Sequence, residues 1–341
     1  MLGPCAGGAA YSPALTDILI MLRDRAHLFL TGPRVVQAVT RESVTAGELG
    51  GAHVHARQSG LAHLVADDAA EALDLARAVL SYLPSSCWDP APIGMPADAE
   101  PLPDLPASKR QVYDVRAIIK GIVDACSFLE LQPEYARNLI TGFARLEGRP
   151  VGVVANQPRS LAGVLDLRAA EKGARFVRLC DAFGLPLITL VDTPGFLPGR
   201  DQESGGVIRR GAKLLFAYAE ATVPRVTVIL RKAFGGAYIV MNSRSLGADA
   251  VFCWPDAEIG VMGAEGAADV IFRRELAADP SRRAALIERY RAEATATRVP
   301  AERLSVDEVI TPAETRRVVA STLRSLAGAI TPRFRHDNLP Q

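Results

Sequence analysis

The chain lacks a net charge of either sign and any long apolar run. Lys and Arg total 39 against 38 for Asp and Glu, which leaves a formal charge of only +1. Because no net field attracts a polyanion, nucleic acid is not an expected partner. The apolar residues 18–22 follow Asp17 and precede Arg23, and no stretch approaches the roughly 20 apolar residues of a membrane span. We therefore expect neither a membrane segment nor a signal peptide.

Cysteine is scarce, and a nucleotide-binding phosphate loop is missing. The five cysteines are scattered, with no CxxC pair: Cys5, Cys87, Cys126, Cys180 and Cys253. Neither a zinc knuckle nor a dithiol redox motif is expected, and a reduced cytoplasmic location fits best. No GxxxxGK[ST] motif occurs, so the segment DTPG at 192–195, although similar to a GTPase switch motif, is not expected to bind a nucleotide.

Three histidines, His53, His55 and His63, lie close together and would be the sharpest candidates for a metal site. No paired carboxylate or thiolate joins them in the sequence. Histidines in polar loops and at helix ends are commoner than metal ligands, and metal sites usually combine several ligand types. We therefore expect no metal.

The chain is long enough for one large domain or two. Of its 341 residues 49% are hydrophobic, which allows a large core. Six prolines fall between Asp89 and Pro106, and such a composition is typical of an extended linker. We predict a first domain over residues 1–88, a proline-rich linker over 89–107 and a second domain over 108–335.

Strands and helices alternate after the linker. Short β-branched runs at 151–155, 187–191 and 226–230 predict strands, and amphipathic stretches at 165–183 and 206–221 predict helices. This alternation is typical of a parallel α/β core.

A weak internal repeat links the two halves. Near the start, GGA at 7–9 leads through Tyr11 and Asp17 to an apolar run and then to TGP at 31–33. Near the other end, GGA at 235–237 leads through Tyr238 and Asp249 to IGV at 259–261 and then to MGA at 262–264. The similar order and spacing predict two domains of one fold.

A strand that ends in Gly-Gly-Ala and passes into a helix exposes consecutive N–H groups at the positive end of a helix dipole. Such a turn can hold an oxyanion, for example the enolate of an acyl thioester, and each preorganised donor is worth about 3 kcal/mol. A simpler reading is that the glycines only allow close packing of helix and strand. Two copies in matching contexts favour function.

The residues carry a family resemblance. GPCAGGAAYSPAL at 3–15 resembles the N-domain signature of the β subunits of acetyl- and propionyl-CoA carboxylases. Further blocks follow in family order: ELGGA (48–52), SG and AH (59–63), YLP (82–84), GFAR (142–145), NQP (156–158), KGARF (172–176), DTPGF (192–196), RKAFGGAYIVM (231–241) and WP with AEI (254–259). Together they cover most of the chain, from about residue 3 to residue 310.

The resemblance implies a crotonase-like fold in each of two tandem domains, the first of them incomplete. It also implies transfer of a carboxyl group from carboxybiotin to the α-carbon of acetyl-CoA or propionyl-CoA. The biotin would be carried by a partner subunit that also holds the biotin carboxylase, not bound covalently to this chain. Biotin itself would take the α-proton, so no protein base and no metal is implied. The active site would lie between two copies in a homo-oligomer, a hexamer in the family.

Roles come from the resemblance position by position. Gly7 and Gly8 match the hole for the thioester enolate, and Gly236 with Ala237 match the hole for the ureido oxygen of biotin. Other positions are matched as neighbours of these holes: Ala6, Tyr11, Gly235, Tyr238 and Ile239 on the substrate side, and the loop of Thr193, Pro194, Gly195 and Phe196 on the biotin side. Ile239 is expected to line the acyl pocket, or else to be core on the first turn of a helix.

Two hypotheses remain open at this point. The first is a carboxyltransferase subunit that lacks the family's upstream segment, which normally supplies strands and much of the CoA site. The second is a truncated, non-catalytic paralogue that acts as an assembly or binding partner of a carboxylase complex. Both Gly-Gly turns and the loop at 192–196 favour the first, and the absence of a supporting strand before Gly3 favours the second.

Overall fold

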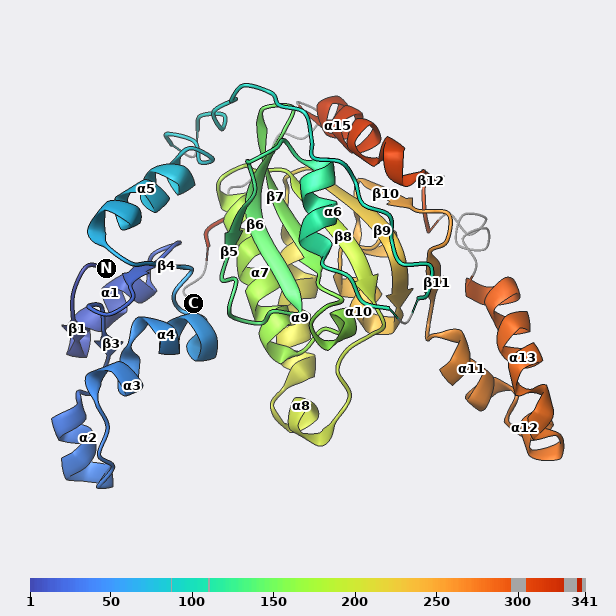
Figure 1. The fold of residues 1–341 in the computed structure, drawn as a ribbon, viewed down its shortest axis with the longest axis horizontal. Helices are drawn as coiled ribbons and strands as arrows, with labels where there is room; N and C mark the ends of the chain where they lie inside the picture. Colours follow the sequence, from blue (N-terminus) through green and yellow to red (C-terminus); the bar gives the residue numbers. More distant parts are fainter. Residues whose placement is uncertain (87, 110, 296–304, 328–335, 339–341) are drawn as a thin grey trace.

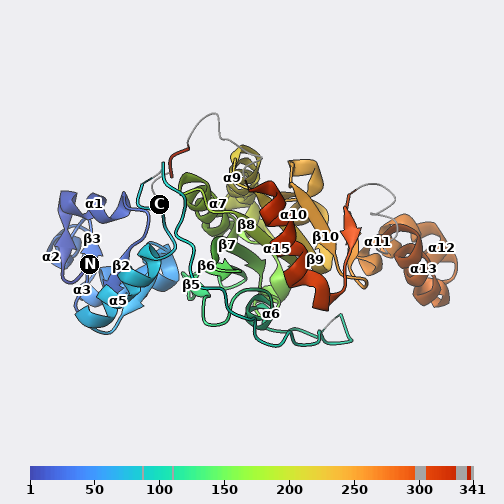
Figure 2. The same ribbon diagram turned by 90° about the horizontal axis from the view of Figure 1, so that it is seen from above.

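The structure is a computed structural model that describes residues 1–86, 88–109, 111–295, 305–327 and 336–338. Along its longest axis lie a small N-terminal region, a central sheet flanked by helices, and an arm of helices (Figures 1 and 2). Cys87 lies outside the described residues, and the other cysteines, Cys5, Cys126, Cys180 and Cys253, are free. None of the helices in the described part is long and apolar enough to cross a membrane.

The central sheet has eight strands and is parallel over most of its width. Its order is β12-β10-β9-β8-β7-β6-β5, and β11 also pairs with β9. The strands are β5 (Leu129–Leu131), β6 (Leu139–Leu146), β7 (Arg149–Asn156), β8 (Leu187–Thr193), β9 (Arg225–Phe234), β10 (Ala250–Cys253), β11 (Glu258–Gly260) and β12 (Glu308–Val309). The predicted parallel core is confirmed from β7 onward, and the sheet continues at its other edge with β6 and β5, which pair antiparallel and were not among the predicted strands.

Helices cover both faces of this sheet (Figures 1 and 2). Helices α7 (Leu167–Ala182) and α9 (Val207–Glu220) pack on one face, and α6 (Val115–Ile122) and α15 (Thr315–Leu326) on the other. The strands alternate accordingly, since Val153 packs toward α6 and Val154 toward α7. The predicted strands at 151–155, 187–191 and 226–230 and the helices at 165–183 and 206–221 are confirmed, with small shifts at their ends.

The N-terminal region is a smaller α/β unit with its own core. Strand β1 (Cys5–Ala6) pairs with β3 (Leu28–Phe29), and β2 (Ile20–Leu22) pairs with β4 (Leu64–Ala66), both in parallel. Its helices are α1 (Tyr11–Ala14), α2 (Pro33–Thr40), α3 (Ala46–Gly50), α4 (Ala52–Val54) and α5 (Ala69–Leu80).

The two halves of the chain share one order of elements and two of their strand pairings, which confirms the predicted repeat. In each half, the residue before the first glycine lies in a parallel strand pair. Ala6 pairs with Phe29 in β3, and Phe234 pairs with Gly260 in β11. Strand β2 pairs with β4 as β10 pairs with β12. Helix α2 then follows Gly32 as α11 (Ala264–Ile271) follows Gly263, and α5 corresponds to α15.

The remaining segments connect these parts. Residues 91–105 form neither helix nor strand, and the domain boundaries proposed around them stay a prediction. Helices α8 (Arg200–Ser204) and α10 (Gly235–Val240) flank α9 along the chain. Helices α11, α12 (Arg273–Ala278) and α13 (Arg283–Tyr290) form the arm at the end opposite the N-terminal region (Figures 1 and 2).

Candidate functional site

The first Gly-Gly turn follows a strand and opens a helix. Strand β1 leads into the short helix η1 (Gly7–Ala10), and Ala6 before it is extended, with φ −143° and ψ 159°. Gly7 has φ +67°, a conformation that residues with a Cβ rarely adopt. A Cβ added to Gly7 or Gly8 would meet no atom within 4 Å. The turn therefore places backbone N–H groups at a helix start with no side chain packed over the glycines.

The second Gly-Gly turn repeats this backbone geometry. Strand β9 leads into α10, Phe234 is extended with φ −118° and ψ 140°, and Gly235 has φ +60°. A Cβ on Gly235 would lie 3.0 Å from the Val261 carbonyl oxygen, and one on Gly236 would lie 3.8 Å from the Phe196 ring. Close packing can account for glycine at 235. It does not account for Gly7 and Gly8, which nothing approaches, so the shared geometry favours a shared chemical role.

Phe196 forms an apolar wall beside the second turn. Its ring lies between Gly236 on α10 and Gly211 on α9, where added Cβ atoms would be 3.8 Å and 3.1 Å from ring atoms. Backbone bonds fix this position, since the N–H of Leu165 donates to Gly195 at 3.0 Å and the N–H of Leu197 donates to Leu165 at 2.7 Å. The preceding Thr193 is fully buried at the end of β8, whereas Pro194 and Gly195 are half-buried.

A buried charge network supports the base of this loop. Asp192 is 1% exposed, and its Oδ2 accepts hydrogen bonds at 3.0 Å from both the Nε of Arg231 and the hydroxyl of Tyr113. Its Oδ1 accepts from the backbone N–H of Lys232 at 3.2 Å. Burial raises the pKa of Asp192, while Arg231 and Lys232 act to lower it. Burial and the neighbouring Asp192 also hold the pKa of Tyr113 well above its usual range.

The other matched residues differ between the two turns. Ala6 and Tyr11 are exposed beside the first turn, with Tyr11 58% exposed. Beside the second, Ala237 is fully buried, and Tyr238 packs in the core, where burial raises its pKa to about 12. Ile239 is 37% exposed, so the alternative that its side chain belongs to the core is wrong.

A single chain does not bring the two turns together. Helix α1, which follows the first turn, lies in the N-terminal region at one end of the molecule, whereas α10 lies beside β9 in the central part (Figures 1 and 2). A site that uses both turns therefore needs a second copy of the chain.

The three histidines have separate roles. The ring of His55 is hydrogen bonded to Ser59 at 2.8 Å and to the Leu28 carbonyl at 2.7 Å, and His63 accepts the N–H of Leu19 at 3.1 Å. His53 is exposed. Within the part of the chain that the structure describes, no group of three or more His, Cys, Asp or Glu residues could hold a metal ion.

Known proteins resemble this chain over its whole length. The family model "Carboxyl transferase domain" matches residues 1–337. The carboxyltransferase subunit of propionyl-CoA carboxylase from Haloferax mediterranei is 50% identical and is matched over 100% of this chain and 68% of its own length. The methylmalonyl-CoA carboxyltransferase 12S subunit of Propionibacterium freudenreichii is 52% identical, over 99% of this chain and 66% of its own length.

The fold agrees with this relationship. A crystal structure of transcarboxylase 12S, described as a hexamer with methylmalonyl-CoA bound, superposes with a TM-score of 0.93 at 50% identity, over 99% of this chain and 67% of that one. The central and N-terminal units are thus crotonase-like, as expected. The chain spans about two thirds of the length of these relatives, 66% and 68%. On this evidence the chain belongs to the carboxyltransferase family that includes the β subunits of propionyl-CoA carboxylases.

Proposed function

We propose that this chain transfers a carboxyl group from carboxybiotin to the α-carbon of a short acyl-CoA, with its two Gly-Gly turns as oxyanion holes. The observation that carries the proposal is the shared geometry of the turns. Each consists of an extended residue, a glycine at positive φ that opens a helix, and a second glycine within the first turn of that helix.

The first turn would hold the thioester. Removal of the α-proton of an acyl-CoA leaves negative charge on the thioester oxygen, and fixed N–H donors stabilise that charge without reorganising. The N–H groups of Gly7 and Gly8 suit this task because neither glycine carries a neighbour within 4 Å of a Cβ position, so an acyl group can approach the backbone.

The second turn would receive biotin, and its residues fit that group. The ureido oxygen of biotin is an acceptor that suits the N–H groups of Gly236 and Ala237 at a helix start, and its apolar ring system suits the half-buried Phe196 beside Gly236. Carboxybiotin, carried on a partner subunit, supplies the carboxyl group when bound. Asp192 and Arg231 hold the base of the Phe196 loop and so orient this wall.

The complete site would form between copies, with the first turn of one chain facing the second turn of another. The relative described as a hexamer with methylmalonyl-CoA bound, and the relatives named for propionyl-CoA, support a homo-oligomer and a propionyl- or methylmalonyl-type substrate. The half-exposed Ile239 beside the second turn gives the acyl group an aliphatic neighbour, which fits acetyl-CoA and propionyl-CoA alike.

The test is carboxyl transfer by the 341-residue chain with a biotin carboxylase and carrier subunit, following labelled bicarbonate into acetyl-CoA and propionyl-CoA. Each turn has a matched pair of variants. Gly8→Ala and Gly236→Ala keep the N–H. The added Cβ would meet no atom within 4 Å at position 8, and at position 236 it would meet only the Phe196 ring, at 3.8 Å. Gly8→Pro and Gly236→Pro remove an N–H in the first turn of each helix, where it has no carbonyl partner within the helix. Because a proline also restricts the residue before it, amide hydrogen exchange over the helix that follows checks that each proline variant keeps its turn.

We expect labelled product from the unmodified chain, and each proline variant to be slower than its alanine partner by about 10²-fold or more, the usual effect of one lost oxyanion donor. Equal rates within each pair would refute the assignment of the turns. No product from the unmodified chain, together with retained binding to the carrier subunit, would favour the non-catalytic binding partner instead.

A further inference from the structure

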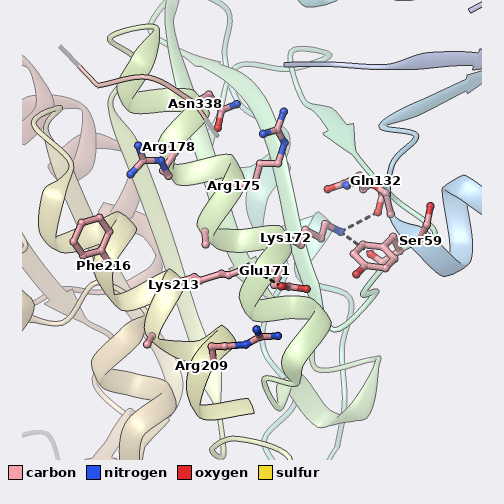
Figure 3. Close-up of a pocket in the computed structure, with 14 residues that line it drawn as sticks. Ser59, Gln132, Glu171, Lys172, Arg175, Arg178, Arg209, Lys213, Phe216 and Asn338 are labelled. Carbon is pink, nitrogen blue, oxygen red and sulfur yellow. Dashed lines mark hydrogen bonds and ion pairs between the residues drawn. The ribbon is translucent and has the colours of Figure 1, made fainter. Parts of the chain in front are cut away.

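The junction between the N-terminal region and the central sheet contains a buried lysine. A cleft of about 650 Å³ opens there between α7, α9 and the N-terminal region, and Lys172, which lines it, points from α7 toward Gln132 (Figure 3). Lys172 is 3% exposed, and its Nζ donates to the carbonyl oxygens of Gln132, Tyr135 and Leu139 at 2.9, 2.9 and 2.8 Å. These bonds use all three hydrogens of the ammonium form, and their acceptors all belong to one loop, residues 132–139. Burial lowers the pKa of Lys172 to about 7.

That loop is hydrogen bonded to the N-terminal region. The backbone N–H of Gln132 donates to the His63 carbonyl oxygen at 2.8 Å, and the side-chain amide of Gln132 donates to the Gly60 carbonyl oxygen. Gln132 and Ala136 have φ of +50° and +43°, which costs energy for residues other than glycine. The three bonds from Lys172 hold this unfavourable loop conformation in place.

Arg175, on the next turn of α7, forms hydrogen bonds to a second segment of the N-terminal region. Its Nη2 donates to the carbonyl oxygens of Thr16 and Asp17 at 2.9 and 3.4 Å. These residues come just after Leu15, the C-cap of α1, which is the helix that follows the Gly7–Gly8 turn. The N–H of Thr16 is itself bonded to Pro13 within that helix, at 3.2 Å.

The two points of contact belong to one rigid piece of backbone. His63 and Leu19 are joined by two hydrogen bonds, from the N–H of Leu19 to the ring of His63 at 3.1 Å and from the N–H of His63 to the Leu19 carbonyl at 2.9 Å. The segment that Arg175 holds is therefore tied to the segment that the loop holds. The two regions are also joined after α5, where Tyr82 stacks on Phe143 and donates to the Ser127 carbonyl oxygen at 2.5 Å, and where Arg145 donates to the Ser81 carbonyl oxygen at 2.6 Å. These contacts hold Ser81 and Tyr82, whereas Lys172 and Arg175 act on the segments around His63 and after α1.

We propose that Lys172 and Arg175 are positioning residues for the thioester-side turn, acting from the second half of the chain through the loop 132–139 and the segment after α1. This inference rests on the proposed role of Gly7 and Gly8. Neither side chain contacts that turn. Together they fix how the turn is oriented relative to the central sheet, and so how it meets the second turn of another copy.

The experiment compares Lys172→Met and Arg175→Gln with two control variants on α9. The controls are Lys213→Met and Arg210→Gln, which remove the same kinds of charge. Lys213 and Arg210 pair with Glu171, at 2.9 and 3.2 Å. Within the described residues neither side chain has an ion pair to the N-terminal region. Amide hydrogen exchange of the full chain is followed over residues 7–19 and 235–241. Carboxyl transfer gives KM separately for acyl-CoA and for the carboxylated carrier.

We expect exchange over residues 7–19 to rise by roughly tenfold or more in the two test variants, with residues 235–241 unchanged. We also expect KM for acyl-CoA to rise while KM for the carrier stays constant, and the controls to behave as the unmodified chain. A role in general stability would raise exchange in both turns, and no change over 7–19 would equally overturn the proposal.

The exchange result does not depend on activity, so it separates failure of this inference from failure of the proposed function. If the unmodified chain transfers no carboxyl group, the proposed function fails while exchange over residues 7–19 still decides the positioning role. If Lys172→Met does not fold, the half-buried Arg175→Gln decides alone, because Arg175 makes the direct contact with the segment after α1.

Discussion

Acid should weaken the junction through His63. The His63 side chain is 4% exposed, and its Nδ1 accepts the backbone N–H of Leu19 at 3.1 Å. Burial, with smaller contributions from the cations Arg175 and Lys172, lowers the pKa of His63 to about 3. A proton on Nδ1 would remove the acceptor and place a third positive charge beside these two cations, so the folded chain requires the neutral ring.

The size of the effect follows from the two pKa values. The unfolded chain binds a proton on this histidine below its ordinary pKa of 6.5, and the folded chain does so only near pH 3. The free energy of unfolding therefore falls as the pH drops from 6.5 toward 3, by about 1.4 kcal/mol per pH unit. Between pH 7 and pH 5 the contribution of His63 is a loss of about 2 kcal/mol.

His63→Asn isolates this contribution, because an asparagine Oδ1 can accept the Leu19 N–H but does not titrate. Urea unfolding of both proteins at pH 7 and pH 5, followed by circular dichroism, gives the loss for each. The unmodified chain should lose about 2 kcal/mol more than the variant over this range. Carboxylates titrate in both proteins and cancel in the comparison. Equal losses would refute the buried, neutral state of His63.

Three further predictions concern stability and use urea unfolding at pH 7. Arg231→Met leaves the 1% exposed Asp192 without its cation and should cost about 3–5 kcal/mol. Tyr113→Phe removes one hydrogen bond to the same carboxylate and should cost about 1.5–3 kcal/mol, so a cost for Arg231→Met no larger than that for Tyr113→Phe would contradict the buried ion pair. Asp166→Ala removes the N-cap of α7, where the carboxylate accepts the Ala169 N–H at 2.8 Å, and should cost about 1 kcal/mol, with Asp166→Asn close to neutral. Trp254→Phe removes the hydrogen bond from the indole N–H to the Thr315 hydroxyl at 2.9 Å and should cost about 1–3 kcal/mol. Thr315→Val removes the acceptor of the same bond and should lower the free energy of unfolding by a similar amount.

Periodicity was enough to predict the centre of the fold. Strands β7 to β9 are buried on both faces and read as continuous apolar runs, and α7 and α9 have one apolar face, so both patterns are visible in the sequence. The antiparallel strands β5 and β6 were not predicted. Strand β5 has only three residues, and its pairing with β6 depends on a loop that Lys172 holds from another element.

The candidate site was predictable only in its backbone. Glycines mark the two turns because a positive φ at Gly7 and Gly235 is visible as a residue type. The partners of Asp192 were not predictable, because Tyr113 lies 79 positions away in the sequence and Arg231 lies 39 positions away. Lys172 belongs to the block at 172–176 that carries the family resemblance, but its burial was not predicted. A lysine in a helix is normally exposed, and its burial here depends on three carbonyl groups that only the folded loop brings together.

The most direct test of the central claim is complementation between copies. The chain with Gly8→Pro keeps its biotin-side turn, and the chain with Gly236→Pro keeps its thioester-side turn, so a mixed oligomer contains sites built from two intact turns. Mixing the two variants after dissociation and reassembly should restore carboxyl transfer to about a quarter of the unmodified rate, the share of intact sites for random pairing. If each variant alone is inactive and the mixture stays inactive although mixed oligomers form, the claim that the two turns of different copies make one site is wrong.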